Sequence, residues 1–266
     1  MNESLQISRE GRVLHAALNR ADKRNALNLD LCRALAETFD EAEADPGVGA
    51  VLLSGHGKSF CAGMDLNEAL SPESGPGPLH EIHERIFTAG VRMTKPVVAA
   101  VQGAALAGGT GLAVNCHVVV AAEDATFGLT EIRIGLWPFI IFRSVAAAVG
   151  ERRAVELALT GRIFGAGEAL EYGLAHYVVD SGELMERARQ IARTAAEASP
   201  TAVRGGLAFL RDARGKSWEE AGALARQMRN EVFRGADFAE GIKAFREKRP
   251  PHWPSLTTQH LGGDST

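Results

Sequence analysis

KPVVAAVQGAALAGGTGL, at Lys95–Leu112, and SFCAGMDL, at Ser59–Leu66, are the two most informative stretches of this chain. The apolar residues of Val97–Val101 are typical of a strand that a parallel sheet buries on both faces. The small residues of Ala107–Gly111 then allow backbone N–H groups to approach a ligand closely. The Ser59–Leu66 stretch passes from apolar to small residues in the same way. A pair of such places can hold a carbonyl oxygen that becomes negative during a reaction.

The glycine-rich turn excludes two common phosphate-binding motifs. No Lys-Ser or Lys-Thr pair follows it, so it is not a Walker A loop, and its GTG lacks the third glycine of a GxGxxG dinucleotide motif. Taken alone, these glycines also fit a helix packed closely on a strand. In the other stretch, Gly63 permits a sharp turn that points the N–H of Met64 outward. Asp65 is interpreted as a helix cap rather than as a catalytic acid.

Strand and helix patterns alternate along most of the chain, and the remainder is helical. Asn28 is expected to cap a helix with Leu31 and Leu35 on its apolar stripe. Further strands are expected at Gly11–Leu18, Ala50–Leu53, His117–Ala121 and Ala175–Val179, and further helices at His80–Met93, Ala107–Asn115, Glu219–Phe233 and Phe238–Glu247. Ser71–Pro78 is rich in Pro, Gly and Ser and is expected to be a loop. This order predicts an α/β core followed by a helical region.

Composition and charge limit the classes of function. Of the 266 residues, 45% are apolar and 23% are charged, as in a soluble globular protein, and the formal net charge is −4, so neither nucleic acid nor an anionic membrane is indicated as a partner. No signal peptide and no apolar run of about 18 residues are evident. Cys32, Cys61 and Cys116 lack CxxC or metal-ligand spacing. We therefore expect a cytoplasmic protein with reduced thiols and no metal site.

Six motifs resemble those of the crotonase superfamily, also called the enoyl-CoA hydratase/isomerase family. They occur in family order over nearly the whole chain: NRADKRNALN (Asn19–Asn28), SFCAGMDL (Ser59–Leu66), KPVVAAVQGAALAGG (Lys95–Gly109), FGLTEIRIGLWP (Phe127–Pro138), LTGRIFGAGEALEYGLAHYVV (Leu159–Val179) and FREKRPPHW (Phe245–Trp253). The resemblance implies a crotonase-type ββα spiral core at residues 1–195 and a C-terminal helical trimerisation region at residues 196–266. It also implies an acyl-CoA thioester substrate, no cofactor beyond the coenzyme A of that substrate, and a homotrimer or a dimer of trimers.

The resemblance further implies roles for particular residues. The N–H groups of Met64 and Gly108 would form an oxyanion hole for the thioester carbonyl, where one donor is typically worth about 3 kcal/mol. The residues expected to bind coenzyme A are Lys23, Arg24, Ala26, Ala62, Asp65 and Leu66, together with Phe245 and Lys248, which would approach the ligand of a neighbouring subunit. From the local sequence alone, Lys23 and Arg24 also fit a solvated loop.

One position departs from the family pattern. Hydratases of this family carry two glutamates, one three residues after the oxyanion glycine and one in the stretch after FG. Here the first position is Gly111 and the second is Glu131. Two carboxylates divide the tasks of hydration, whereas moving a double bond needs one base, and the family's isomerases keep only the second carboxylate. We expect Gly111 to face the acyl site and to accept a glutamate without serious damage to folding.

Glu131 is the candidate base. Apolar neighbours such as Phe127 and Trp137 would raise its pKa toward neutrality by desolvation. A surface glutamate paired with an arginine is the alternative interpretation of this residue. The family's dehalogenases carry a nucleophilic aspartate at the position of Phe139, which argues against that activity. Phe139–Phe142 instead suggests an apolar wall, so Trp137 and Phe139 are expected in the acyl pocket.

The sequence therefore predicts an acyl-CoA enzyme that stabilises a thioester enolate. Enoyl-CoA isomerisation with Glu131 as the single base is the leading hypothesis. An enoyl-CoA hydratase in which Glu131 and an ordered water suffice is the first alternative, and a non-catalytic acyl-CoA binder is the second. Four further titratable residues near the first stretch could face the acyl pocket, and we interpret each of them as a solvated helix residue: Glu68, Glu81, His83 and Glu84.

Overall fold

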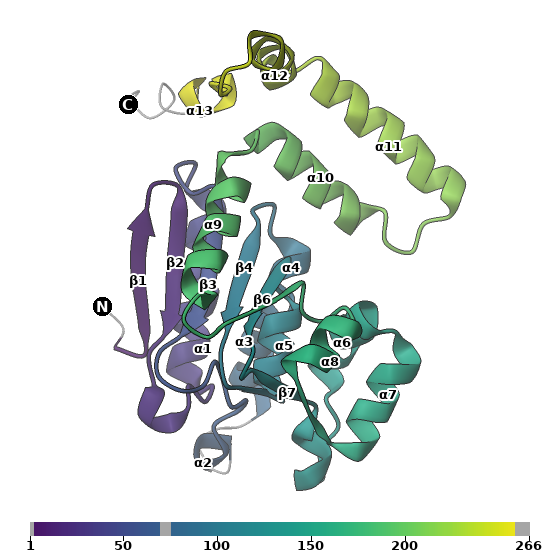
Figure 1. The fold of residues 1–266 in the computed structure, drawn as a ribbon. Helices are drawn as coiled ribbons and strands as arrows, with labels where there is room; N and C mark the ends of the chain where they lie inside the picture. Colours follow the sequence, from purple (N-terminus) through teal and green to yellow (C-terminus); the bar gives the residue numbers. More distant parts are fainter. Residues whose placement is uncertain (1–2, 70–75, 259–266) are drawn as a thin grey trace.

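The computed structural model describes residues 3–69 and 76–258, and its core is a six-stranded sheet (Figure 1). The strands of this sheet are, in spatial order, β1 (Leu5–Glu10), β2 (Val13–Leu18), β3 (Ala50–Gly55), β4 (Val97–Val101), β6 (Val118–Ala122) and β9 (Tyr177–Val179). β1 pairs with β2 in an antiparallel hairpin, and the other neighbours are parallel. A smaller sheet contains β5 (Ala104–Leu106), β7 (Thr126–Gly128) and β8 (Ile163–Gly165).

The chain passes repeatedly from the large sheet to the small sheet and then into helices. β4 continues into β5 and α5, and β6 continues into β7 and then α6. The helices that precede the C-terminal region are α1 (Leu29–Ala44), α2 (Leu66–Ala69), α3 (Pro76–Phe87), α4 (Ala89–Arg92), α5 (Gly108–Val114), α6 (Phe139–Val149), α7 (Glu151–Thr160), α8 (Ala166–Glu171) and α9 (Leu184–Glu197). The predicted α/β core with its ββα repeats is confirmed.

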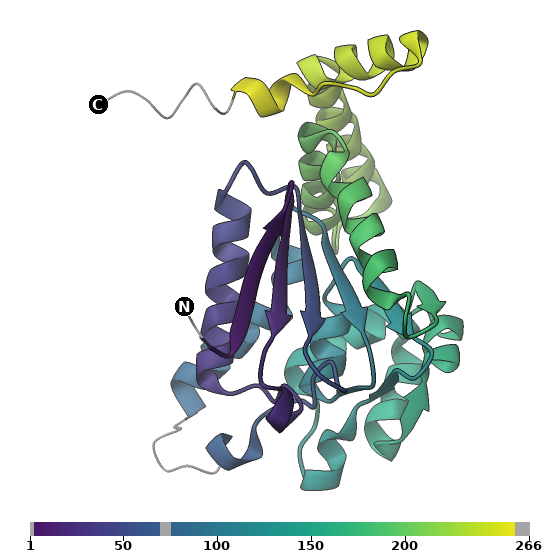
Figure 2. The ribbon, with the colours of Figure 1, turned by 60° about the vertical axis from the view of Figure 1, so that its left-hand side comes forward.

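Helices cover both faces of the large sheet, which is why β4 can consist of five buried apolar residues. Figure 2 shows α1 on one face and α9 on the other. Every fourth residue of α9 from Leu184 to Ala196 is buried, so these residues form one stripe against the sheet. Three of the four are alanines, and the close approach they permit is visible at Gly49, where a Cβ would lie 2.7 Å from the Ala196 carbonyl oxygen.

Most predicted elements are confirmed, but the strand β1 was not predicted, and one helix and one loop differ from expectation. Asn28 caps α1 by accepting a hydrogen bond from the Leu31 N–H at 3.1 Å. The predicted helix at His80–Met93 is two helices, because the chain turns at Thr88 between α3 and α4. α3 begins at Pro76, so the end of the predicted loop at Ser71–Pro78 is helical, while residues 71–75 lie outside the described residues.

The C-terminal region consists of α10 (Pro200–Asp212), α11 (Trp218–Phe233), α12 (Ala236–Glu247) and α13 (Pro254–Thr258), and it extends away from the sheet (Figure 1). α10 and α11 contain no buried residue. Large exposed apolar side chains here are Leu210, Trp218, Phe233, Phe238, Ile242 and Phe245. Exposed apolar area of this kind is typical of a protein–protein contact. Throughout residues 3–69 and 76–258, no helix combines the length and apolar character needed to cross a membrane.

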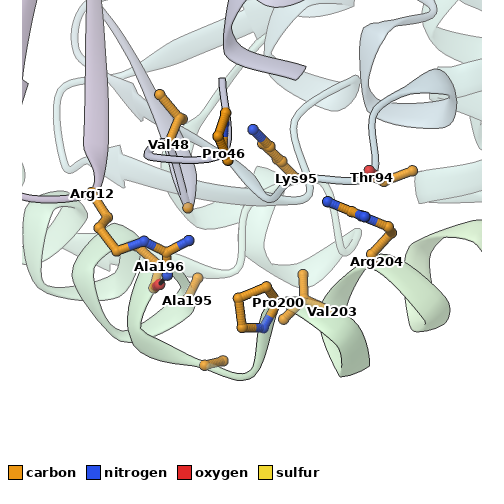
Figure 3. A pocket seen from close by; sticks show the side chains of 12 residues that line it. Arg12, Pro46, Val48, Thr94, Lys95, Ala195, Ala196, Pro200, Val203 and Arg204 are labelled. Atoms are coloured by element: carbon orange, nitrogen blue, oxygen red, sulfur yellow. Dashed lines mark hydrogen bonds between the residues drawn. The ribbon is translucent and has the colours of Figure 1, made fainter. Parts of the chain in front are cut away.

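The C-terminal region joins the core beside a hollow of about 30 Å³, which is room for about one water molecule. Figure 3 shows Arg12, Lys95 and Arg204 around it. Arg12 donates a hydrogen bond to the carbonyl of Ala196 at the end of α9, and Lys95 donates to the carbonyl of Ala42 near the end of α1. Arg12 precedes β2, and Lys95 precedes β4. Their hydrogen bonds therefore connect the ends of α9 and α1 to the amino ends of these strands.

Candidate active site

A cavity of about 410 Å³ lies among the segments that follow β3, β5 and β7. Seven of the residues singled out in the sequence line it: Ala62, Met64, Leu66, Gly108, Glu131, Trp137 and Phe139. Ile141 of the predicted apolar wall also lines it, as do His83, Leu27 and Phe87. Most of these side chains are apolar and only a few groups are polar, as in most small-molecule pockets.

Met64 and Gly108 line this cavity from two adjacent segments. Their segments pair through a parallel bridge between Cys61 and Ala105. Gly63, with φ +95°, allows the two segments to approach each other closely. A Cβ at this position would lie 3.4 Å from the Gly108 nitrogen. In the described part of the chain, neither the Met64 N–H nor the Gly108 N–H donates a hydrogen bond. Two such donors can together bind one negatively charged oxygen.

Neighbouring backbone bonds explain why the Met64 N–H is available. Leu27 runs alongside this segment, and its N–H donates to the Gly63 carbonyl at 2.8 Å. The Asp65 N–H donates back to the Leu27 carbonyl at 3.0 Å. In a parallel bridge of this kind, one strand's residues on either side of the central residue make both hydrogen bonds to the partner strand. The N–H of the central residue therefore points away from that partner strand. Met64 is that residue, and its N–H points toward the cavity.

A strained turn precedes the Gly108 N–H. Ala107 has φ 50° and ψ −120°, a conformation that costs a non-glycine residue about 1–3 kcal/mol. Its N–H donates to the Gly128 carbonyl at 2.8 Å, and the Thr110 hydroxyl donates to the Ala105 carbonyl at 2.7 Å. These bonds hold the turn, so the chain leaves β5 and begins α5 at Gly108 with its N–H directed away from the strand.

Arg20 and Asn25 fix the loop that the resemblance assigns to coenzyme A. Both lie in the motif NRADKRNALN, but the sequence predicted no role for either. Asn25 is fully buried at φ 53°, and its amide donates to the carbonyls of His56 and Ser59 at 2.9 and 2.8 Å. The Asn25 side-chain oxygen accepts from the Arg20 N–H at 2.9 Å. The Arg20 guanidinium pairs with Asp65 at 3.0 Å. These contacts hold the loop against the Met64 segment.

Glu131 lies in a 3₁₀ turn, Thr130–Ile134, directly after β7, and is 8% exposed. Burial raises the pKa of Glu131 from 4.5 to about 7, and a hydrogen bond from its own backbone N–H acts in the opposite direction. Among the described residues, its Oε2 has no hydrogen-bond partner and no arginine pairs with it. The predicted desolvation is confirmed, and the alternative of a surface glutamate paired with an arginine is wrong.

Gly111 does not face the cavity, so that expectation is wrong. It is buried in α5, and a Cβ there would lie 3.0 Å from the Ile141 Cβ and 3.2 Å from the Phe87 Cε1. Ile141 and Phe87 themselves line the cavity and stand between it and Gly111. A glutamate at this position therefore requires a change in the surrounding packing.

The remaining coenzyme A candidates fall into two groups. Lys23 and Arg24 are exposed in the loop beside the cavity, where the Arg24 carbonyl accepts a hydrogen bond from the Ala62 N–H at 2.9 Å. Ala26 lies in the same loop, half-buried. By contrast, Phe245 and Lys248 belong to the end of α12, far from α2 in Figures 1 and 2, so they do not meet the cavity of their own chain.

The four titratable residues interpreted as solvated differ from one another. Glu81 and Glu84 are exposed, as expected, and the Glu68 Oε2 accepts a hydrogen bond from the Leu29 N–H at 2.7 Å. Asp65 caps α2 as predicted, by accepting from the Asn67 N–H at 3.2 Å. His83 is 7% exposed and lines the cavity, so its interpretation as a solvated residue is wrong.

All three cysteines are in the interior of the protein. Cys32, Cys61 and Cys116 are buried free thiols, and burial raises the pKa of Cys61 and of Cys116 to about 12. Across residues 3–69 and 76–258, no group of His, Cys, Asp and Glu side chains is arranged to hold a metal ion.

Comparisons with known proteins agree with this geometry. The sequence profile of the enoyl-CoA hydratase/isomerase family matches residues 8–256. A Thermus thermophilus protein provisionally assigned as an enoyl-CoA hydratase is 38% identical, covering 92% of this chain and 98% of its own. A 2,3-dehydroadipyl-CoA hydratase of Escherichia coli is 34% identical, covering 93% and 97%. The crystal structure of a Bacillus anthracis enoyl-CoA hydratase matches with a TM-score of 0.88 at 31% identity, covering 95% and 99%. This chain is a member of the enoyl-CoA hydratase/isomerase family, the crotonase superfamily of acyl-CoA-processing enzymes.

Proposed function

We propose that this protein is an enoyl-CoA isomerase that moves a double bond through a thioester enolate. The Met64 and Gly108 N–H groups bind the thioester oxygen, and the Glu131 carboxylate takes a proton from C2 of a 3-enoyl-CoA. The electron pair of the broken C–H bond moves into the thioester, which becomes an enolate. A proton added at C4 then leaves the double bond between C2 and C3.

The single observation that carries this proposal is the number of carboxylates at the cavity. Among the described residues that line it, Glu131 is the only Asp or Glu. Its buried, unpartnered Oε2 and its raised pKa suit a base that works near neutral pH. The space for a second carboxylate at Gly111 is filled by Ile141 and Phe87. The resemblance implies that isomerases of this family keep one carboxylate here, whereas its hydratases carry two.

The lining indicates the class of acyl group. Apart from Glu131 and His83, the described residues around the cavity carry no titratable side chain, and its outer part consists of apolar residues such as Leu136, Trp137 and Ile140. We therefore propose an uncharged hydrocarbon acyl chain, because a terminal carboxylate would lose its hydration against these apolar side chains. Each methylene group buried there contributes about 0.8 kcal/mol to binding.

The coenzyme A part of the substrate is proposed to lie along the loop of Lys23 and Arg24, whose exposed cations suit its phosphates. The exposed apolar residues of α10, α11 and α12 support a homotrimer or a dimer of trimers. In such an assembly Phe245 and Lys248 would reach the substrate of a neighbouring subunit. The proposed boundary between the two functional regions lies at residues 195 and 196, near the end of α9.

Enoyl-CoA hydration is the second candidate function. The observation that favours it is the naming of two relatives: the one at 34% identity is named a hydratase, and the one at 38% is provisionally named so. In this alternative, water is held in the cavity without a carboxylate at position 111. A non-catalytic acyl-CoA binder is less well supported, since binding alone has no use for a buried carboxylate beside the thioester.

The test is a panel of 2-enoyl-, 3-enoyl- and 3-hydroxyacyl-CoA thioesters, with products identified by mass and absorbance. The proposal expects 3-enoyl-CoA to become 2-enoyl-CoA with no change in mass. A gain of one water by 2-enoyl-CoA, without isomerisation of 3-enoyl-CoA, would establish the hydratase instead. Tight binding of all three thioesters without any turnover would establish the binder.

A further inference from the structure

A second titratable side chain lies in the cavity with Glu131. His83 is on α3, is 7% exposed, and lines the same space as Glu131 and the Gly108 backbone. Its neighbours on that helix, Glu81 and Glu84, are exposed. Because residues on one side of a helix recur every three or four positions, His83 shares its side with Phe87. The side of α3 that faces the cavity therefore carries an imidazole.

Phe87 links His83 to the place where the thioester oxygen is proposed to bind. The rings of His83 and Phe87 have centroids 5.6 Å apart. The Phe87 ring also comes within 3.2 Å of the point where a Cβ of Gly108 would lie, and within 3.2 Å of that point for Gly111. Phe87 thus occupies part of the space that a glutamate side chain at position 111 would need, and His83 packs against Phe87 on the same helix.

His83 and Glu131 line the cavity from different elements of the fold. Glu131 belongs to the turn after β7, and His83 belongs to α3, which precedes β4. An enolate extended by a double bond carries negative charge on the thioester oxygen, on C2 and on C4. A titratable group on another lining element, such as the His83 imidazole, can protonate C4 while the Glu131 carboxylate stays at C2.

Resting on the proposed isomerase function, we propose that His83 is a catalytic acid that delivers the proton to C4, while Glu131 removes the proton from C2. The C2–H bond breaks, its proton goes to the Glu131 carboxylate, and its electron pair enters the thioester. The C4–H bond then forms with a proton from the His83 imidazolium, and the double bond moves to C2–C3. Glu131 releases its proton to water and His83 takes one from water, which restores both groups. Imidazole suits this task because it gains and loses protons near neutral pH.

Isotope transfer in the unmodified enzyme is the first test. A 3-enoyl-CoA carrying deuterium at C2 is converted in ordinary water, and the deuterium at C4 of the product is measured by mass spectrometry and NMR. Two separate groups predict that C4 receives solvent hydrogen, so that almost no deuterium appears there under single-turnover conditions. Substantial transfer of deuterium from C2 to C4 would mean that one base serves both carbons, and would overturn the proposal.

Variants of His83 separate the two half-reactions. His83→Gln and His83→Asn are compared with Glu84→Gln, an exposed change on the same helix, after circular dichroism and acyl-CoA binding confirm folding. The expected result for either His83 variant is isomerisation slowed by about 10²–10⁴-fold. Exchange of the C2 hydrogen of a saturated acyl-CoA in heavy water should remain within threefold of wild type, because Glu131 carries out that step alone.

The outcomes distinguish this proposal from the proposed function. Isomerisation at the wild-type rate in a folded His83 variant would overturn the role of His83 and leave the isomerase function standing. Equal losses of isomerisation and C2 exchange would also overturn it, because they indicate a structural role for the imidazole. If the wild-type enzyme neither isomerises 3-enoyl-CoA nor exchanges C2 hydrogen, the proposed function itself has failed.

Discussion

Ile141 and Gly111 form one packing unit, since the Cβ of Ile141 lies 3.0 Å from the point at which a Cβ of residue 111 would stand. Ile141 is on α6 and Gly111 is on α5, and each is buried. The absence of a carboxylate at position 111 therefore does not leave empty space. A branched side chain and the Phe87 ring have taken that space, and the cavity wall here is apolar.

The first prediction follows from this contact. Gly111→Glu alone should destabilise the protein by about 2–4 kcal/mol, because it overpacks the interior and buries a carboxylate. The double variant Gly111→Glu with Ile141→Ala should recover much of that loss and gain measurable addition of water to 2-enoyl-CoA. Urea unfolding at one protein concentration measures the first effect, and product mass measures the second. A single variant as stable as wild type would show that the observed packing does not constrain this position.

The pKa of Glu131 gives a stability that changes with pH. Burial raises this pKa from 4.5 to about 7, so the folded protein holds the proton more tightly than the unfolded chain. The resulting stabilisation is complete below about pH 4.5 and is lost as the pH rises through about 7. Relative to Glu131→Gln, which does not titrate, wild type should lose about 1–3 kcal/mol between pH 5 and pH 8. Urea unfolding of both proteins at the two pH values checks this. The same difference at both pH values would contradict a raised pKa.

Asn25 provides a prediction about the loop that positions Met64. Asn25→Asp keeps the shape of the side chain but removes the two N–H bonds to the carbonyls of His56 and Ser59. The expected loss of stability is about 2–4 kcal/mol. Asn28→Asp is the matched control, because Asn28 only accepts a hydrogen bond, from the Leu31 N–H, and aspartate caps a helix equally well. Equal stabilities of the two variants in urea would show that Asn25 does not anchor the loop.

The backbone N–H of Met64 can be removed without removing a hydrogen bond within the protein. Met64→Pro should slow every reaction that passes through the enolate by about 10²–10³-fold, whereas Met64→Ala should change the rate far less. Gly63 precedes it with φ +95°, and a glycine tolerates a following proline better than other residues do. Both variants are compared by circular dichroism and by turnover. Equal activity in two folded variants would mean that this N–H does not bind the thioester oxygen.

The sequence predicted the elements that long, regular patterns describe. Val97–Val101 matched β4 because a run of five apolar residues beside a glycine-rich turn is typical of a strand buried on both faces. The three-residue strands β5, β7 and β8 were missed because they carry no measurable period, and the six-residue β1 was missed because its residues are mostly polar. The burial of Glu131 could be predicted from its apolar neighbours and from the motif register. The packing of Gly111 could not, because Ile141 is distant in sequence, and the anchoring role of Asn25 depends on a positive φ and on carbonyls in another segment.

The most direct measurement of the central claim is exchange of the C2 hydrogens of a saturated acyl-CoA in heavy water, followed by NMR for wild type and Glu131→Gln. This reaction needs only the base and the site that stabilises the enolate, so neither the acyl-chain preference nor the overall reaction affects the answer. We expect wild type to exchange these hydrogens and Glu131→Gln to exchange them about 10²–10⁴-fold more slowly, with acyl-CoA affinity nearly unchanged. Exchange by a folded Glu131→Gln variant within threefold of wild type would contradict the assignment of Glu131 as the base.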